Sequence, residues 1–267
     1  MTVESWLVNN TKILEEAGIK NPRLDLLILL EQTLGKNRAL LLANSDYELQ
    51  DYELSSLSAR LNRRLLREPL AYILNEKYFY GRKFFVDDSV LIPRPESESF
   101  IDLLKRHTQN SLSLLDIGTG SGCLAITAKL ELPDIEVTAT DISEKALEVA
   151  QRNAKEHSAT VSFMKANLVP EGTPKYDVVL ANLPYVPKNM KLEKELEFEP
   201  KDALFAENDG LELIQNLIQL LPKVMNNNGL FLCESLVIQH LRVKQLAAQQ
   251  NLELVETAGL VQLYKLR

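Results

Sequence analysis

The sequence predicts an α/β protein in which a small all-helical domain precedes a seven-stranded, mainly parallel sheet with helices on both faces. From Thr2 to about Asn75, apolar residues recur at helical spacing. Beyond residue 93, strand-like and helix-like segments alternate, which is the pattern of a covered parallel sheet. The length of 267 residues suits one large domain with a smaller one attached.

Three regions are predicted, and they differ in pattern. Residues 1–75 form the helical domain. Residues 76–92 begin with the aromatic-rich stretch "EKYFYGRKFFVDD" around Gly81, which predicts a linking β-hairpin. Residues 93–267 form the sheet domain, with helices at about 122–130, 143–157 and 211–225. Its strands are expected at 112–118, 135–141, 160–167, 176–182, 229–235, 252–258 and 260–266. Because only Gly259 separates the last two, they should form an antiparallel hairpin at one edge.

Composition argues against several classes of protein. The net charge of -7 disfavours bulk electrostatic binding to nucleic acid. No apolar run approaches the ~20 residues of a membrane helix and no leader pattern is present, so a cytoplasmic protein without membrane contact is expected. Cys123 and Cys233 are expected to be buried, reduced thiols. Because the histidines are scattered and no cluster has zinc-ligand spacing, no metal is predicted.

The stretch "LLDIGTGSGC" predicts the cofactor site, because it leads from a strand into a helix with glycines at 118, 120 and 122. Cys123 stands where a dinucleotide fingerprint needs its third glycine, and the spacing is the one associated with S-adenosylmethionine (SAM). Asp141 ends the next strand, where its carboxylate can accept from both ribose hydroxyls. A tight turn, with Asp141 as a helix cap, is the structural alternative.

Asn167 ends the following strand and offers a side-chain carbonyl to the adenine amino group, although a turn asparagine is an equal alternative. The predicted cofactor-binding residues are Asp116, Gly118, Thr119, Gly120, Gly122, Asp141, Ile142, Asn167, Leu168 and Asn182.

The tetrapeptide Asn182, Leu183, Pro184 and Tyr185 is predicted to be catalytic, since it lies at the carboxyl end of the strand at 176–180. The side-chain oxygen of Asn182 and the carbonyl of Leu183 can each accept one N–H of a planar amino or amide group, which aims its nitrogen at a methyl donor. Pro184 fixes the backbone, and Tyr185 is expected to stack on the substrate. For this carbonyl, the side chain of Leu183 is expected to be incidental. The motif alone leaves adenine, guanine and glutamine open.

Other segments resemble a known family. "REPLAYIL", "YFYGRKFFVDDSVLIPRPESE", "LDIGTGSG", "ANLPY" and "FEPKDALFAENDGLELI" together are similar to the bacterial peptide chain release factor glutamine methyltransferases, HemK/PrmC. The resemblance implies a Rossmann-like SAM-dependent methyltransferase domain and a helical domain that helps grip the release factor. It implies methylation of the glutamine side-chain amide in the Gly-Gly-Gln motif, in support of translation termination. Asn182 and the Leu183 carbonyl would clamp that amide, Asp141 would bind the ribose, and Gly118 the methionine end of SAM. Arg94 and Glu96, in "PRPE", would position the substrate.

The sequence departs from this family in three places. Leu183 stands where a proline is usual, "AEN" replaces a glycine pair before "DGL", and Gln262 replaces a customary arginine. Leu183 keeps the carbonyl but loosens its fixation, so a lower activity with unchanged chemistry is expected.

Two alternatives remain at this stage. The first is a ribosomal RNA adenine N6-methyltransferase, which shares the tetrapeptide. The second is a SAM-binding protein that grips release factor without methylating it. A monomer without sequence-specific nucleic-acid binding is expected. A row of arginines at helical spacing is expected to be a solvated face, with the release factor or its RNA surroundings as the alternative; it comprises Arg60, Arg63, Arg64 and Arg67.

Overall fold

The computed structural model describes residues 1–108, 111–170 and 172–267. The chain divides into two compact units: a helical unit of residues 1–75 with 193–198, and a sheet unit of residues 76–192 with 199–267. Residues 193–198 thus group with the helical unit, although the sequence analysis placed them within residues 93–267.

The helical unit is built around an apolar core that includes Trp6, Leu14 and Leu57. Its elements are α1 (Val3–Glu16), α2 (Pro22–Leu34), α3 (Arg38–Ala43), α4 (Asp51–Leu65), α5 (Leu70–Leu74) and the 3₁₀ turn η2 (Lys194–Phe198). The Thr2 hydroxyl caps α1 by accepting from the Ser5 N–H at 3.2 Å.

The predicted arginine face is solvated only in part. It comprises Arg60, Arg63, Arg64 and Arg67. Arg64 is only 7% exposed; its guanidinium donates to Asp25 at 2.7 Å and to Glu195 at 3.3 Å. Arg67 donates to the other oxygen of Glu195 at 2.8 Å. The expectation of a solvated face is therefore wrong for Arg64, because Asp25 and Glu195 form ion pairs with its buried guanidinium.

The predicted linking hairpin is present at the start of the sheet unit. Strands β1 (Lys77–Phe79) and β2 (Arg82–Phe84) pair antiparallel across a two-residue turn. Tyr80 and Gly81 both have positive φ, 48° and 72°, as a type I′ turn requires.

A seven-stranded sheet forms the centre of the sheet unit, as predicted, in the order β10-β11-β9-β6-β3-β4-β5. Its strands are β3 (Ser113–Ile117), β4 (Glu136–Asp141), β5 (Ser162–Lys165), β6 (Tyr176–Ala181), β9 (Met225–Glu234), β10 (Leu252–Ala258) and β11 (Val261–Leu266). The first five run parallel to one another, and β11 runs antiparallel to both β9 and β10. The predicted edge hairpin is therefore confirmed.

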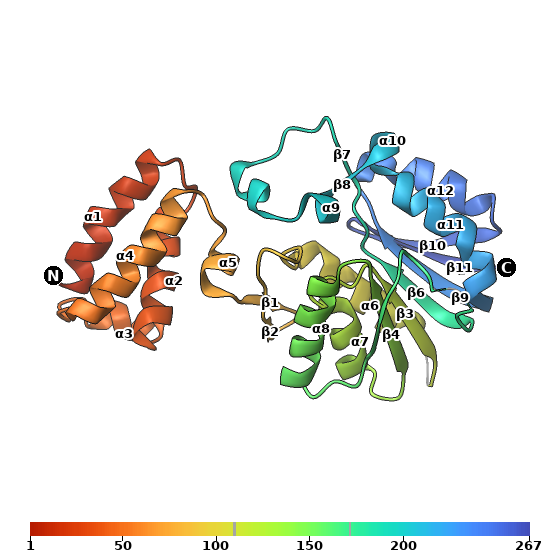
Figure 1. Cartoon of the computed structure of the whole chain (residues 1–267), viewed down its shortest axis with the longest axis horizontal. Coiled ribbons are helices and arrows are strands. Elements are labelled where there is room, and N and C mark those ends of the chain that lie inside the picture. Colours follow the sequence, from red (N-terminus) through yellow and green to blue (C-terminus); the bar gives the residue numbers. More distant parts are fainter. Residues whose placement is uncertain (109–110, 171) are drawn as a thin grey trace. The chain divides into compact units, whose positions relative to one another are not determined.

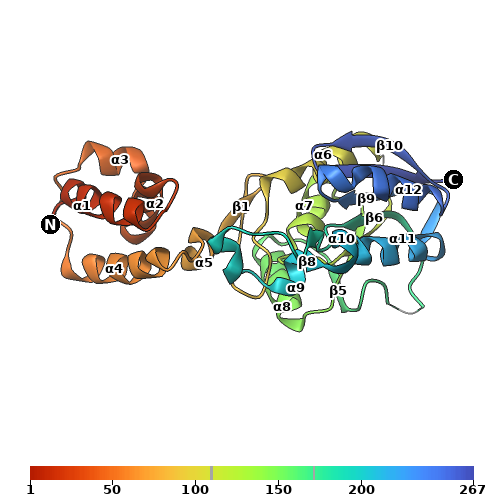
Figure 2. The same ribbon diagram turned by 90° about the horizontal axis from the view of Figure 1, so that it is seen from above.

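Helices cover both faces of this sheet (Figures 1 and 2). On one face α6 (Glu98–His107), α7 (Cys123–Glu131) and α8 (Glu144–Glu156) share a core with Val178 and Leu180 of β6. On the other, α11 (Glu212–Val224) and α12 (His240–Ala248) share a core with Val179 and Ala181 of the same strand. Burial on both faces explains why β6 is apolar throughout rather than alternating.

Short elements complete the sheet unit. They are η1 (Pro95–Ser97), β7 (Val186–Pro187), α9 (Lys201–Leu204), β8 (Phe205–Ala206), α10 (Glu207–Gly210) and η3 (Val237–Gln239). After β3 the chain continues to β4 and β5 on one side, and then returns to β6 on the other side of β3. Such a reversal opens a crevice at the carboxyl ends of the strands, and this is where parallel sheets bind ligands.

The buried pair Asp25–Arg64 provides a test of the helical unit. We expect Arg64→Met to lower its free energy of unfolding by about 3 kcal/mol or more, because the buried Asp25 carboxylate loses the Arg64 guanidinium, whereas Glu195 keeps Arg67. Arg60→Met, which removes the bond to the Thr33 hydroxyl at 2.8 Å, should cost about 1 kcal/mol or less. Trp6, the one tryptophan of the chain, lies in this core, so urea unfolding followed by its fluorescence reports on this unit. Equal losses in the two variants would contradict the assignment.

Candidate active site

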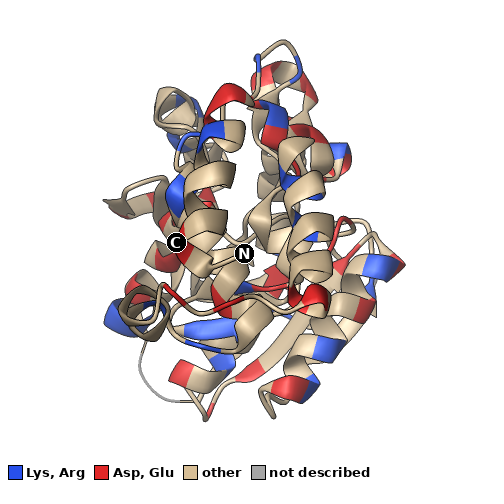
Figure 3. Ribbon diagram, turned by 90° about the vertical axis from the view of Figure 1, so that its left-hand side faces the viewer, with Lys and Arg blue, Asp and Glu red and all other residues tan. Residues whose placement is uncertain are grey.

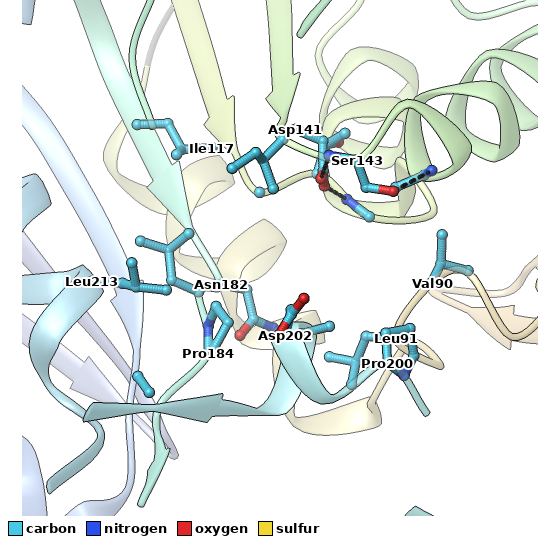
Figure 4. Close-up of a pocket in the computed structure, with 18 of the residues that line it drawn as sticks. Val90, Leu91, Ile117, Asp141, Ser143, Asn182, Pro184, Pro200, Asp202 and Leu213 are labelled. Carbon is cyan, nitrogen blue, oxygen red and sulfur yellow. Dashed lines mark hydrogen bonds between the residues drawn. The ribbon is translucent and has the colours of Figure 1, made fainter. Parts of the chain in front are cut away.

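A pocket of about 500 Å³ opens at the carboxyl ends of the central strands. Figure 4 shows Asp141 and Ser143 on one side of it and Asn182 and Pro184 on the other. The predicted site residues that line it are Arg94, Gly118, Thr119, Gly120, Asp141, Ile142, Asn167, Leu168, Asn182, Leu183 and Pro184. Asp116, Gly122, Tyr185 and Glu96 are not among its lining residues.

The three glycines of the loop between β3 and α7 serve different purposes. All have positive φ: 71° at Gly118, 54° at Gly120 and 79° at Gly122. A Cβ on Gly122 would lie 2.9 Å from Ile126 and 3.0 Å from Ala150, so this glycine allows α7 and α8 to pack closely. A Cβ on Gly120 would meet no atom within 4 Å. Gly120 therefore presents bare backbone to the pocket, as close approach to a ligand requires.

Asp141 connects this loop to the end of β4. One carboxylate oxygen accepts from the Gly120 N–H at 2.9 Å and the other from the Ser143 N–H at 2.9 Å. Ser143 itself caps α8 by accepting from the Ala146 N–H at 3.2 Å, so Asp141 is not needed as that cap. Each oxygen of Asp141 keeps a further lone pair for a hydroxyl in the pocket.

Asp116 lies beneath the loop rather than in the pocket wall. Burial raises the pKa of its carboxyl to about 6, and the Thr119 hydroxyl, which donates at 2.6 Å, acts against that rise. Within the described ranges its other oxygen is buried without a hydrogen-bond partner. Asp116 therefore holds the loop through Thr119 and adds negative potential below it.

The side of the pocket formed by the chain after β4 and β5 contains Ile142, Asn167 and Leu168. Leu168 has a positive φ of 62°, and its carbonyl accepts from the Thr140 hydroxyl at 2.9 Å. This bond ties the turn after β5 to β4, so Asn167 lies at the same carboxyl edge of the sheet as Asp141.

The tetrapeptide divides between the pocket and the core. Asn182, Leu183 and Pro184 line the pocket, and the Asn182 side-chain NH₂ donates to the Ser97 hydroxyl at 2.9 Å. Leu183 is only 5% exposed and belongs to the core shared with α11. A Cβ on Gly118 would lie 2.9 Å from Leu183 Cδ2. Besides the carbonyl that its backbone offers, Leu183 therefore contributes a side chain that packs directly against the glycine loop.

Tyr185 was expected to stack on the substrate, but the structure places its hydroxyl against a buried carboxylate. It donates to Glu234 Oε1 at 2.7 Å. Burial and the nearby Glu234 charge raise the pKa of this phenol, so it remains a donor. Tyr185 thus bonds to Glu234 and does not belong to the residues that line the pocket.

Arg94 joins two of the segments that carry the family resemblance. Its guanidinium donates to Glu199 at 2.5 Å, and the second oxygen of Glu199 accepts from the Ile92 N–H at 3.1 Å. The "PRPE" and "EPKDAL" segments therefore meet at the pocket wall. Glu96 is exposed within η1.

Comparisons with known proteins agree with this architecture. Family models described as PrmC N-terminal domain and Methyltransferase small domain match residues 5–74 and 96–231. A release factor glutamine methyltransferase of Geobacter sulfurreducens is 36% identical and covers 83% of this chain and 79% of its own length. The chain belongs to the release factor glutamine methyltransferase family.

Two further matches define the extent of the similarity. A bifunctional methyltransferase of Rickettsia bellii is 36% identical over 87% of this chain, which spans only 48% of that relative's length. A solved methyltransferase from Pyrococcus furiosus has a TM-score of 0.54 at 19% identity, with coverage of 78% of this chain and 98% of its own. The second match shows the fold alone.

As a member of this family, the chain is a SAM-dependent methyltransferase. The pocket fits that cofactor, because Gly120 leaves its backbone open and the Asp141 carboxylate lines the same space. The volume of about 500 Å³ is also within the range for a small-molecule cofactor. Among the residues that the structure describes, no cluster of three or more His, Cys, Asp or Glu could hold a metal ion. No helix in the described ranges is long and apolar enough to cross a membrane.

The sequence analysis missed three residues that shape this site: Ser97, Glu199 and Glu234. Glu234 carried a usable signal, since it is a carboxylate at the carboxyl end of a buried strand. Glu199 lay within a segment already singled out for its resemblance. Ser97 gave no signal of its own, because a serine before a helix is typical of a cap.

The "AENDGL" departure is accommodated by backbone conformation. Asn208, Asp209 and Gly210 have φ values of 53°, 54° and 84°. A Cβ on Gly210 would lie 2.1 Å from the Tyr185 carbonyl oxygen. The Gln239 amide donates to that oxygen and to the Asp209 carbonyl, at 2.8 Å each. This turn is therefore fixed against the tetrapeptide without the usual glycine pair.

Matched glycine variants separate cofactor binding from packing. We expect Gly120→Ala to weaken SAM binding at least tenfold, because its methyl group enters the pocket, with a cost of about 1–2 kcal/mol in stability for the positive φ. Gly122→Ala should cost more stability, because about 1–3 kcal/mol of overpacking between α7 and α8 adds to the same backbone cost. Calorimetric Kd values for SAM and thermal unfolding measure the two effects. An unchanged Kd for Gly120→Ala would contradict the assignment of the pocket.

Proposed function

We propose that this protein transfers a methyl group from SAM to the side-chain amide nitrogen of the glutamine in the Gly-Gly-Gln motif of peptide chain release factors. The observation that carries the proposal is the arrangement of one pocket, with the Gly120–Asp141 pair on one side and the Asn182–Pro184 segment on the other. The relatives named release factor glutamine methyltransferase supply the substrate class.

The cofactor side of the pocket would hold SAM through a few groups. The free lone pairs of Asp141 would accept the ribose hydroxyls, and the Asn167 carbonyl the adenine amino group. The bare backbone at Gly118 and Gly120 would lie along the methionine end. When bound, SAM supplies an electrophilic methyl group on a positively charged sulfur.

The acceptor side would hold the amide nitrogen of glutamine. This nitrogen is a weak nucleophile because its lone pair is conjugated with the carbonyl, and it gains positive charge as the bond to methyl forms. Asn182 Oδ1 and the Leu183 carbonyl each accept one of its N–H groups, which orients the nitrogen and stabilises that charge. Pro184 follows directly and restricts the backbone of Leu183 to extended conformations.

Charge argues against the RNA alternative. The net charge is -7, and Figure 3 shows Lys and Arg interspersed with Asp and Glu along the ribbon. Arg64 and Arg67 of the predicted basic face are already paired with Glu195. Phosphate binding needs unpaired cations, so this face is a poor candidate for RNA.

The test incubates the chain with methyl-labelled SAM and either a release factor or ribosomal RNA. We expect label on the release factor, and none after the Gly-Gly-Gln glutamine is replaced by alanine. Label on RNA, or label that persists on the altered factor, would overturn the proposal. Label on neither would support a binding protein without activity.

Asn182→Ala tests the acceptor side specifically. We expect it to lower the methylation rate roughly 100-fold or more, because it removes one oriented acceptor from the transition state. The Kd for SAM should change by about twofold or less, since Asn182 acts on the nucleophile. Equal losses of rate and SAM affinity would assign Asn182 to the cofactor instead.

A further inference from the structure

A buried chain of hydrogen bonds ends on the side chain of Asn182. The Asn182 NH₂ donates to Ser97 Oγ at 2.9 Å, and the Ser97 hydroxyl donates to Glu234 Oε2 at 2.6 Å. The Tyr185 hydroxyl donates to the remaining oxygen, Glu234 Oε1, at 2.7 Å. Ser97 comes from η1, Glu234 from the end of β9, and Asn182 and Tyr185 from the segment after β6.

The direction of these bonds follows from the chemistry of the groups. A carboxylate has no proton to donate, so Ser97 must give its hydroxyl proton to Glu234. Ser97 Oγ can then only accept a hydrogen bond, so the group of Asn182 that contacts it must be a donor. The Asn182 amide must therefore direct its NH₂ toward Ser97 and its oxygen away from it. No described residue donates to Asn182 Oδ1, which leaves this oxygen available in the pocket.

We propose that Ser97 and Glu234 are positioning residues that fix which end of the Asn182 amide faces the substrate. The inference rests on the proposed function, because an acceptor is needed only if Asn182 receives an N–H group. With the amide reversed, its NH₂ would face the substrate NH₂, and two donors repel rather than bind.

Burial of Ser97 and Glu234 strengthens their effect on the orientation of the Asn182 amide. Ser97 is 2% exposed and Glu234 is 1% exposed, so water does not compete for their bonds. Tyr185 occupies the oxygen of Glu234 that Ser97 leaves free, so each carboxylate oxygen receives one hydroxyl. A proton on Glu234 Oε2 would reverse the two bonds that lead to Asn182, since Ser97 would then accept from Glu234 and donate to Asn182.

A double-mutant cycle tests whether Ser97 acts through Asn182. We expect Ser97→Ala to lower kcat for release factor roughly 10- to 100-fold, because the amide is no longer held in one orientation. The Kd for SAM should stay within about twofold. In an Asn182→Ala background the same change should alter kcat by about twofold or less, since no amide remains to orient. Ser99→Ala, two residues along in α6 and outside this chain of bonds, is the matched control and should behave like the unaltered protein.

Glu234→Gln is the second variant, and it keeps the shape of the side chain. The NH₂ of the new side chain can donate to Ser97 and so reverse the direction of the bonds. We expect a loss of kcat similar to that of Ser97→Ala. The midpoint of thermal unfolding and the Kd for SAM should be retained.

The outcomes separate this inference from the function on which it rests. If the unaltered chain labels release factor but Ser97→Ala keeps full kcat, or if its loss is as large in the Asn182→Ala background, the positioning role is overturned alone. If the unaltered chain does not label release factor, the proposed function and the inference both fall. If Ser97→Ala loses SAM affinity in parallel with kcat, Ser97 supports the pocket as a whole rather than the Asn182 amide.

Discussion

The parallel register of four neighbouring strands places the chemistry of this protein in one row. Ile117 of β3 pairs with Thr140 of β4 and with Ala181 of β6, and Ala181 pairs with Cys233 of β9. The residues that follow these four in the chain are Gly118, Asp141, Asn182 and Glu234. The glycine loop, the carboxylate of Asp141, the amide of Asn182 and the buried carboxylate of Glu234 thus leave the sheet at the same level. A slip of one residue in any of these strands would turn its side chains to the opposite face, and the site residues would no longer lie together.

Side-chain packing beneath these residues makes the pocket rigid. Leu183 lies against Gly118, so the two sides of the pocket contact each other through the core rather than through solvent. Gln239 donates to the Tyr185 carbonyl, and Gly210 lacks the Cβ that would clash with it. The family departure at Leu183 therefore exchanges the stiffness of a proline for the burial of a large apolar side chain. Its backbone carbonyl, which is the group the proposed chemistry uses, does not depend on the identity of that side chain.

Much of this could be predicted from the sequence, because it depends on local pattern. The strands, the glycine loop, the placement of Asp141 and Asn182 and the edge hairpin all follow from hydrophobic periodicity and from glycine and turn residues. The partners of the site residues could not, because they come from distant segments. Ser97 and Glu234 are separated in sequence from Asn182, and Arg94 meets Glu199 only after folding. Arg64 was misjudged, and the bond from Tyr185 to Glu234 was not foreseen, for the same reason: a polar side chain can point inward when a buried carboxylate receives it.

Neutron diffraction from deuterated crystals of the chain, with S-adenosylhomocysteine and a peptide containing Gly-Gly-Gln, would test the central claim most directly. It distinguishes the oxygen of the Asn182 amide from its deuterated nitrogen. We expect the glutamine nitrogen about 3 Å from Asn182 Oδ1 and from the Leu183 carbonyl, with the Asn182 nitrogen on Ser97 Oγ. An Asn182 nitrogen that faces the glutamine nitrogen, or a glutamine bound away from Asn182, would contradict it.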